Sequence, residues 1–332
     1  MQNRREAILA GIATASRLHR SLDLRRLVEH DCARIDVFGS IIRSKIPLVF
    51  RPLEGLLGAY LPSPKGIIIT TQRPLSVQRF TGAHELGHAA LGHEGSLDDD
   101  SLLSRSPFAS PSYDQVEAAA DAFATNFLLP IWMIEIQASR HKWTRADLLN
   151  PVVVYQLSLR VGASYRATCM ALRRHELIDQ GSTNHLLSVE VKTIKRQLLD
   201  GHELDNWHPD VWLLTEADAE TSIEGDARDA FVLRLKENSS AGYLWNIDQL
   251  EQAGFLIFHD GRVLPEVGAD VGGPVERVLG AQSQQGQRGH VDLHQVRPWQ
   301  SASPLTTFSL AFDLRGKETG RPRAERRQLA AA

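Results

Sequence analysis

The sequence predicts an α+β protein of two domains, the first mainly helical with a few strands and the second mostly strands. Three observations carry this prediction. The chain has 332 residues, more than one ordinary compact core contains. Apolar residues recur at helical spacings through the first half, whereas Phe231, Leu233 and Leu235 alternate along the chain as in a strand. A polar, glycine-containing stretch at 179–184 separates the two patterns.

The composition is that of a soluble globular protein. Hydrophobic residues make up 42% and charged residues 23%, and 37 basic against 40 acidic side chains give a net charge of −3. No global basic field therefore points to nucleic acid or to a membrane surface. Two cysteines exclude a disulfide scaffold and fit a reducing cytosol. With no secretory signal pattern and no run of 18 apolar residues, we expect a cytoplasmic protein that does not span a membrane.

Turn residues and periodicity define the expected elements. Pro74 starts a helix that continues to Leu91, and Pro130 ends a second helix that begins near Ser112. The polar residues between them, 94–113, are expected to form a surface loop. Further helices are expected over 1–45 and 131–178, and short strands over 46–51, 56–61 and 66–71.

These patterns predict the division of the chain. We expect a first domain at 1–178, a linker at 179–187, a second domain at 188–314 and a disordered basic tail at 315–332. Within the second domain, Asp260 and Gly261 lie between two apolar runs and predict a hairpin turn.

The most informative segment is RFTGAHELGHAALGH at 79–93, which contains an HExxH motif. On a helix, His84 and His88 are four residues apart and share a face, so both imidazoles can reach one Zn²⁺. Glu85 follows the first histidine and projects beside the metal, where it can take a proton from the attacking water.

A third ligand is needed, and two classes of zinc peptidase supply it differently. In the HExxHxxGxxH class it is a third histidine, but Leu91 and Glu94 occupy the glycine and histidine positions, which disfavours that class. In the other class it is a glutamate on a second helix. In QVEAAADAFATNFLLP at 115–130, Glu117 completes a His₂Glu site, and Asp121, four residues later, can hold a ligand imidazole.

The two motifs together, FTGAHELGHAALGH and ExxxDAFATNFLLP, resemble the ImmA/IrrE metallopeptidases. The resemblance covers about residues 20–178 and implies a compact thermolysin-like zinc domain holding one Zn²⁺ per chain. It implies His84, His88 and Glu117 as ligands and Glu85 as general base. It further implies cleavage of helix-turn-helix repressors or antitoxins, and so a role in transcription regulation and stress response.

Two features of the first domain stay open from sequence. The group that stabilises the oxyanion is not assigned, with His93, Tyr113 and His141 as candidates. Residues 155–177 look like a helix-turn-helix, with Gly162 at the turn and Ser164 able to cap the second helix. The family commonly packs a similar helical pair on its catalytic core, so we favour that interpretation and expect no direct nucleic-acid binding.

The second domain holds three loop motifs in order: NSSAGYLW, a Gly-Gly turn and RPW. Over about residues 208–314 this arrangement resembles the chagasin-type inhibitors of papain-like cysteine peptidases. It implies an immunoglobulin-like β-sandwich with three docking loops at one end. Their predicted docking residues are Asn238, Gly242, Tyr243, Trp245, Gly272, Gly273, Arg297 and Trp299.

The leading hypothesis is a zinc endopeptidase whose sandwich recruits or regulates. Ser239 and Ala241 depart from the Pro and Thr of the inhibitor motif, in the loop that would enter a peptidase cleft. This disfavours inhibition of a papain-like cysteine peptidase, although such an enzyme stays a partner to test. The alternative is a protein-binding regulator or peptidase inhibitor with a mainly structural zinc domain.

Overall fold

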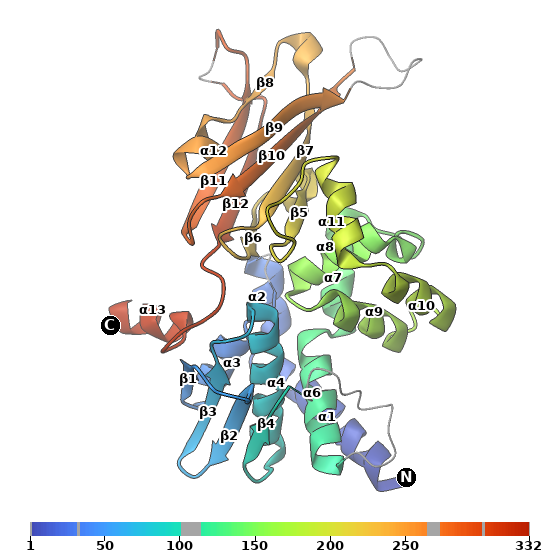
Figure 1. Cartoon of the computed structure of the whole chain (residues 1–332), viewed down its shortest axis with the longest axis vertical. Helices are drawn as coiled ribbons and strands as arrows, with labels where there is room; N and C mark the ends of the chain where they lie inside the picture. Colours follow the sequence, from blue (N-terminus) through green and yellow to red (C-terminus); the bar gives the residue numbers. More distant parts are fainter. Residues whose placement is uncertain (1, 32–33, 101–113, 264–272, 301–302, 332) are drawn as a thin grey trace.

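The chain folds into a helical body with a small sheet, joined to a body of two stacked sheets (Figure 1). This computed structural model describes residues 2–31, 34–100, 114–263, 273–300 and 303–331. The mixture of helices and sheets confirms the predicted α+β class, and the second body is the predicted β-sandwich.

The small sheet lies beside the helix that carries the HExxH motif (Figure 1). Its strand order is β1-β3-β2-β4; β1 is parallel to β3, and the other pairs are antiparallel. Three strands match the expected runs, but the fourth was predicted as surface loop, so that prediction is wrong for 96–98. Residues 101–113 of that loop lie outside the described residues. The strands are β1 (Leu48–Arg51), β2 (Gly58–Pro62), β3 (Lys65–Thr70) and β4 (Ser96–Asp98).

Helices α4 (Leu75–Leu91) and α6 (Gln115–Leu128) form the centre of the first body. α4 begins after Pro74 and ends at Gly92, whose φ of +73° suits a residue without a side chain. Asp114 caps α6 by accepting a hydrogen bond from the Val116 amide. Helix α1 (Gln2–Ser21) packs along α6, and the expected long N-terminal helix continues as α2 (Leu24–Asp31) and α3 (Val37–Arg43).

The predicted helix-turn-helix look-alike is a buried helical pair. α8 (Pro151–Val161) ends at Gly162, and Ser164 caps α9 (Tyr165–Arg174) by accepting from the Ala167 amide. Both helices contribute fully buried side chains to the core, which they share with α7 (Ile131–His141). This packing agrees with the structural interpretation.

The structure places helices where the sequence predicted a linker. Asp179 accepts a hydrogen bond from the Ser182 amide and so caps α10 (Gln180–Ser188), which buries Leu186. α11 (Val191–Leu199) follows and buries Ile194. The linker prediction is wrong because a short polar helix with a few buried apolar residues resembles a loop in composition.

The second body is built from two four-stranded sheets, ordered β5-β7-β10-β9 and β6-β12-β11-β8. Aromatic and aliphatic side chains from both sheets, including Trp212, Phe231 and Phe308, fill the space between them. The predicted hairpin at Asp260-Gly261 is wrong, because both residues continue β9. The strands are β5 (Val211–Leu214), β6 (Thr221–Glu224), β7 (Ala230–Glu237), β8 (Leu244–Asn246), β9 (Phe255–Val263), β10 (Val275–Ser283), β11 (Arg288–Val296) and β12 (Thr306–Asp313).

Side chains of α8 bind the backbone of β5, the edge strand of one sheet. Gln156 accepts from the Leu213 amide and donates to the Val211 carbonyl, both at 2.8 Å. Tyr155 accepts from the Val211 amide at 3.0 Å, and Arg160 donates to the Leu213 carbonyl at 2.7 Å. Because an edge strand otherwise leaves these groups unpaired, α8 takes the place of a neighbouring strand.

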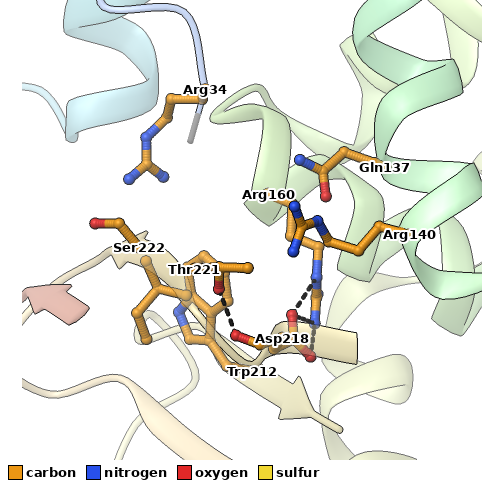
Figure 2. A pocket seen from close by; sticks show the side chains of 9 residues that line it. Arg34, Gln137, Arg140, Arg160, Trp212, Asp218, Thr221 and Ser222 are labelled. Atoms are coloured by element: carbon orange, nitrogen blue, oxygen red, sulfur yellow. Dashed lines mark hydrogen bonds and ion pairs between the residues drawn. The ribbon is translucent and has the colours of Figure 1, made fainter. Parts of the chain in front are cut away.

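Arg160 also anchors a small pocket between the two bodies (Figure 2). Its guanidinium donates to both carboxylate oxygens of Asp218 at 2.8–3.0 Å, and both side chains are less than one-tenth exposed. The body with the sandwich is thus held by a buried ion pair in addition to backbone contacts.

The last described segment returns to the first body, so the prediction of a disordered tail is wrong. Gly320 exchanges two backbone hydrogen bonds with Phe50 of β1, and Glu318 exchanges two with the Gln78 side chain of α4. The segment ends in α13 (Arg323–Ala331), which contacts α3. Its basic residues are held because buried acidic groups face them: Arg323 lies near Glu318 and Asp313.

Among the described residues, one stretch, Gln115–His141, is long and apolar enough to cross a membrane by length and composition. Its most apolar window is 67% buried inside the fold, because α6 and α7 are core helices.

Candidate metal centre

Three side chains predicted as metal ligands meet between α4 and α6. His84 Nε2 lies 2.9 Å from His88 Nε2 and 3.3 Å from Glu117 Oε2, and His88 Nε2 lies 3.6 Å from Glu117 Oε1. The two histidines are one helical turn apart, and Glu117 reaches them from the first turn of α6. All three ligand atoms lie within 4.8 Å of one another. The structure thus brings together the three residues that the sequence singled out.

The two imidazole rings are held from behind. Asp121 Oδ1 lies 2.9 Å from His84 Nδ1, and His93 Nδ1 lies 3.0 Å from His88 Nδ1. Since Nδ1 and Nε2 are on opposite sides of the ring, these contacts turn the Nε2 atoms towards Glu117. His93, a candidate for oxyanion stabilisation, therefore lies behind a predicted ligand instead.

Glu85 is fully buried beside the three ligand residues. The hydroxyl of Ser96 in β4 donates a hydrogen bond of 2.6 Å to Glu85 Oε2. Strand β2 approaches closely here, since a Cβ on Gly58 would meet Glu85 Oε1 at 3.1 Å and Thr81 at 2.5 Å. The carboxylate predicted as general base is therefore fixed in one place by α4, β2 and β4.

Burial and neighbouring charges shift the pKa values of His84, Glu85 and His88 in different directions. Burial lowers the pKa of His84, but hydrogen bonds and charges of Asp121, Glu117 and Asp98 outweigh it and raise the pKa to about 10. Burial and the neighbouring His84 lower the pKa of His88 to about 3. Burial raises the pKa of Glu85 well above its usual range; His84 opposes this rise and Asp98 adds to it.

The donor set fits a zinc ion. Zinc takes imidazole nitrogen and carboxylate oxygen at about 2.0–2.1 Å in a tetrahedron, which sets neighbouring donor atoms about 3.3 Å apart. The 2.9 Å between the two Nε2 atoms, and the 3.3 and 3.6 Å from them to Glu117 Oε2 and Oε1 respectively, lie near that value. A divalent cation would also compensate the negative charge of the buried carboxylates better than the two imidazoles do alone.

Two residues of this cluster, Ser96 and Asp98, were missed by sequence reasoning. Asp98 is 2% exposed, and its Oδ2 lies 3.3 Å from His84 Nε2. Asp98 reaches the metal centre because β4 pairs with β2. The polar sequence around Asp98 gives no local indication of that strand pairing. Of the other oxyanion candidates, Tyr113 lies outside the described residues, and His141 instead contacts Asp218 and Arg160 between the two bodies.

Two of the three predicted docking loops meet at one end of the sandwich. The Arg297 guanidinium lies 4.5 Å from the centre of the Tyr243 ring and donates to the Ala241 carbonyl at 3.1 Å. Gly242 touches Trp299, because a Cβ on the glycine would lie 2.7 Å from that indole. In the third loop Gly272 lies outside the described residues, whereas Gly273 precedes β10.

The docking residues differ in exposure. Trp299 is 73% exposed, whereas Trp245 is 4% exposed and donates its indole N–H to the Lys236 carbonyl. Asn238 donates to Gln295 at 2.8 Å and is partly buried. Trp245 is thus a core residue. Trp299, Tyr243 and Arg297 form the accessible group, here called the aromatic tip.

The fold and the site together define a metallopeptidase-type domain followed by an inhibitor-type β-sandwich. Comparison of the sequence with protein families agrees with both parts. Residues 43–173 match the IrrE N-terminal-like domain, and residues 226–312 match the chagasin family of peptidase inhibitors, I42. The chain therefore joins an IrrE-like metallopeptidase domain to a chagasin-like domain, as the resemblance predicted.

Three known proteins are each similar to a part of this chain. The radiation response metalloprotease IrrE of Deinococcus deserti is 30% identical over 180 residues, which are 49% of this chain and 62% of that protein. The cysteine protease inhibitor EhICP2 of Entamoeba histolytica is 20% identical with a TM-score of 0.27, covering 32% of this chain and 98% of its own. Amebosin is 22% identical with a TM-score of 0.26, covering 32% and 97%.

Proposed function

We propose that this chain is a zinc-dependent endopeptidase that binds one Zn²⁺ through His84, His88 and Glu117. The observation that carries the proposal is the convergence of these three donor groups within 4.8 Å of one another, with the buried Glu85 carboxylate beside them. A purely structural zinc site closes all four positions and needs no buried base at its side. The IrrE-like domain supports the same class of activity.

The residues divide the reaction between them. When bound, zinc supplies a Lewis acid that polarises the scissile carbonyl and makes water a better nucleophile at neutral pH. Glu85 takes a proton from the attacking water as oxygen adds to the carbonyl carbon, and returns it to the amine nitrogen when the C–N bond breaks. Asp121 and His93 keep the two imidazoles oriented throughout.

For the substrate we propose a helix-turn-helix repressor or an antitoxin in the cytoplasm. This follows from the resemblance of both zinc-site motifs to the ImmA/IrrE metallopeptidases, and a relative named for radiation response supports it. Such a protein would link cleavage to transcription. The buried packing of α8 and α9 agrees with a protein substrate that binds DNA while the peptidase itself does not.

Exchange of the general base tests the chemistry. Glu85→Gln keeps the size of the side chain and the three ligands, so we expect full zinc content and a loss of cleavage by about 10²–10⁴-fold or more. The matched control is Glu94→Gln, an exposed carboxylate just beyond α4, which should cleave like the parent. The assay incubates purified helix-turn-helix proteins of the same organism with each variant and identifies cleaved products by mass spectrometry. Equal cleavage by Glu85→Gln and parent would reject Glu85 as the base.

The sandwich would serve as a recruitment module. Its loop end near β8 points away from α4, so the aromatic tip does not reach the metal centre of the same chain (Figure 1). This arrangement favours capture of a second protein over direct gating of the metal centre. The exposed Trp299 and the cation–π pair of Arg297 and Tyr243 are residue types that dominate protein interfaces.

A second candidate function is inhibition of a papain-like cysteine peptidase through the same loops. The match of 226–312 to the chagasin family favours it, and the exposed tip would be available for it. Ser239 and Ala241 argue against it, because they replace the Pro and Thr of the inhibitor motif in the loop that would enter a peptidase cleft. Addition of the full chain to papain tests this directly: tight inhibition, untouched by Glu85→Gln, would make inhibition the leading function.

A further inference from the structure

Strand β4 lies along the sheet edge nearest the metal centre. Its residues Ser96–Asp98 pair antiparallel with Gly58–Tyr60 of β2, and the Leu57 amide donates to the Asp98 carbonyl at 2.7 Å. Without β4, strand β2 would be the free edge of this sheet beside α4. A free edge beside a peptidase site is where an extended peptide can add as a further strand. In this structure the chain's own segment holds that position.

Side chains alternate along β4, so those of Ser96 and Asp98 face Glu85 and His84 at the metal centre. Leu97 is 72% exposed, while its neighbours point inward: Ser96 donates to Glu85 at 2.6 Å, and Asp98 Oδ2 lies 3.3 Å from His84 Nε2. Asp98, Glu85 and His88 also offer ligand atoms within 4.8 Å of one another. One short strand therefore contacts both the proposed base and the proposed ligands.

The position of Asp98 has an electrostatic cost that a metal would offset. Its carboxylate is 2% exposed and offers a ligand atom within 4.8 Å of those of Glu85 and His88. Burial removes the hydration of a carboxylate and like charges repel, so a cation placed between two such groups lowers the free-energy cost of keeping both ionised. The 3.3 Å separation from His84 Nε2 equals the spacing of neighbouring donors around tetrahedral zinc, which is about 3.3 Å.

We propose that Asp98 is a displaceable fourth ligand and that β4 is a built-in occupant of the substrate position. Three ligands, His84, His88 and Glu117, leave one position of a tetrahedral ion open, and the Asp98 carboxylate, whose Oδ2 lies 3.3 Å from His84 Nε2, would close it. A substrate strand must then displace β4 before the carbonyl can reach the metal. The chain would be latent until a substrate or partner pulls this strand away. The inference rests on the proposed function, because it requires zinc at those three ligands.

Access to the metal tests the inference independently of turnover. The probe is a dipeptide hydroxamate, a zinc chelator with a peptide backbone, and its affinity for the zinc-loaded full chain is measured by calorimetry. We compare the parent with Asp98→Asn, and use Asp99→Asn, an exposed neighbouring carboxylate, as the matched control. If the closed state dominates the parent, removal of the ligand should tighten hydroxamate binding by about ten-fold or more. Asp99→Asn should bind it like the parent.

Hydrogen exchange gives a second reading on the unmodified chain. Saturating hydroxamate should speed exchange of the Leu57 amide, since that amide is bonded to the Asp98 carbonyl only while β4 is in place. Unchanged exchange would overturn the displacement of β4, even if the variant failed to fold.

The outcomes separate this inference from the proposed function. Zinc-loaded parent and Asp98→Asn with equal hydroxamate affinity would overturn the inference and leave the endopeptidase proposal standing. Loss of zinc from Asp98→Asn would also overturn it, because Asp98 would then be an obligatory ligand and not a displaceable one. A parent chain that binds no zinc would overturn both.

Discussion

The metal centre and the aromatic tip each gather several functional side chains, and they are built in opposite ways. At the metal centre, His84, Glu85 and His88 are at most 1% exposed, and carboxylates face imidazoles at 2.9–3.6 Å. At the tip, Trp299 is 73% exposed and lies against Gly242 of a neighbouring loop. The first site is organised by the core and the second stands on the surface.

The difference in burial determines which substitutions each site can tolerate. A buried cluster depends on every member, since loss of one group leaves charges without their partners. An exposed aromatic group adds little to folding and can change with little cost, while it can dominate binding to another protein. Substitutions at the metal centre and at the aromatic tip should therefore affect different measurements.

The largest effect is expected at the metal centre. His88→Ala removes one of three proposed ligands. If a structural zinc site is worth about 10–16 kcal/mol, loss of one ligand should weaken zinc binding by on the order of 10³-fold, and cleavage with it. Metal analysis of the purified chain measures this directly. His185→Ala, an exposed histidine on α10, is the control and should keep the parent's zinc content, whereas full zinc content in His88→Ala would rule out this site.

The next effect is expected between the two bodies. Arg160→Ala leaves Asp218 buried without its guanidinium and frees the Leu213 carbonyl of the edge strand. Breaking a buried pair in this way costs about 3–5 kcal/mol, so the urea midpoint should fall clearly. Arg25→Ala breaks an exposed pair with Glu29 and should cost no more than about 0.5 kcal/mol. Equal midpoints for the two variants would mean that α8 does not secure the sandwich.

At the aromatic tip the effect should appear in binding and not in folding. Trp299→Ala should change stability by less than about 0.5 kcal/mol, because the side chain is mostly exposed. Its capture of a cognate substrate protein should weaken by about ten-fold or more if the tip is a hot spot. Surface plasmon resonance with the inactive Glu85→Gln chain measures this without turnover. Unaltered affinity would remove the tip from the recruitment proposal.

The smallest effect is a pH dependence of stability from His141. Burial, with the nearby Arg160 and Arg140, lowers its pKa to about 4, and although Asp218 opposes this shift, Arg160 donates to the neutral ring at 3.0 Å. The unfolded chain binds the proton with a pKa near 6.5, so stability is full above that pH and declines as pH falls towards 4. Between pH 7.5 and 5.5 this group should account for roughly 1 kcal/mol.

The check is the difference in urea midpoint between those two pH values, for the parent and His141→Asn. The variant should show a smaller pH dependence than the parent, because its amide does not titrate in this range. An identical dependence would show that His141 is not protonated on unfolding.

The first body could be predicted in detail because its chemistry is local. The spacing of His84 and His88 is one helical turn, and Pro74 and Gly92 mark the helix ends in the sequence itself. Glu117 and Asp121 repeat this spacing on α6. The strands and helices of residues 46–91 and the residues 115–128 were therefore predicted within a few positions, and so were the donor groups that the structure brings together.

The sequence-based predictions were wrong where a polar or basic composition suggested a linker or a disordered tail but the segment is folded. Residues 180–188 are polar yet helical, since a few residues such as Leu186 dock on the core. The tail after 314 is basic yet ordered up to α13, since Glu318 and Asp313 bind its arginines. Because α8 also binds the edge of β5, removal of residues 187–332 would expose buried polar groups, and point substitutions test the sandwich more cleanly.

The sequence by itself was enough to predict the two kinds of domain and to propose His84, His88 and Glu117 as donors with Glu85 as base, because within each motif the residue types recur at short fixed spacings. Only the tertiary structure decided how β4 seats Ser96 and Asp98 against that centre, how α8 completes the edge of β5, and which docking residues are exposed. These features join segments tens of residues apart, or more than a hundred, and hydrogen bonding and burial select such pairs only once the whole chain has folded.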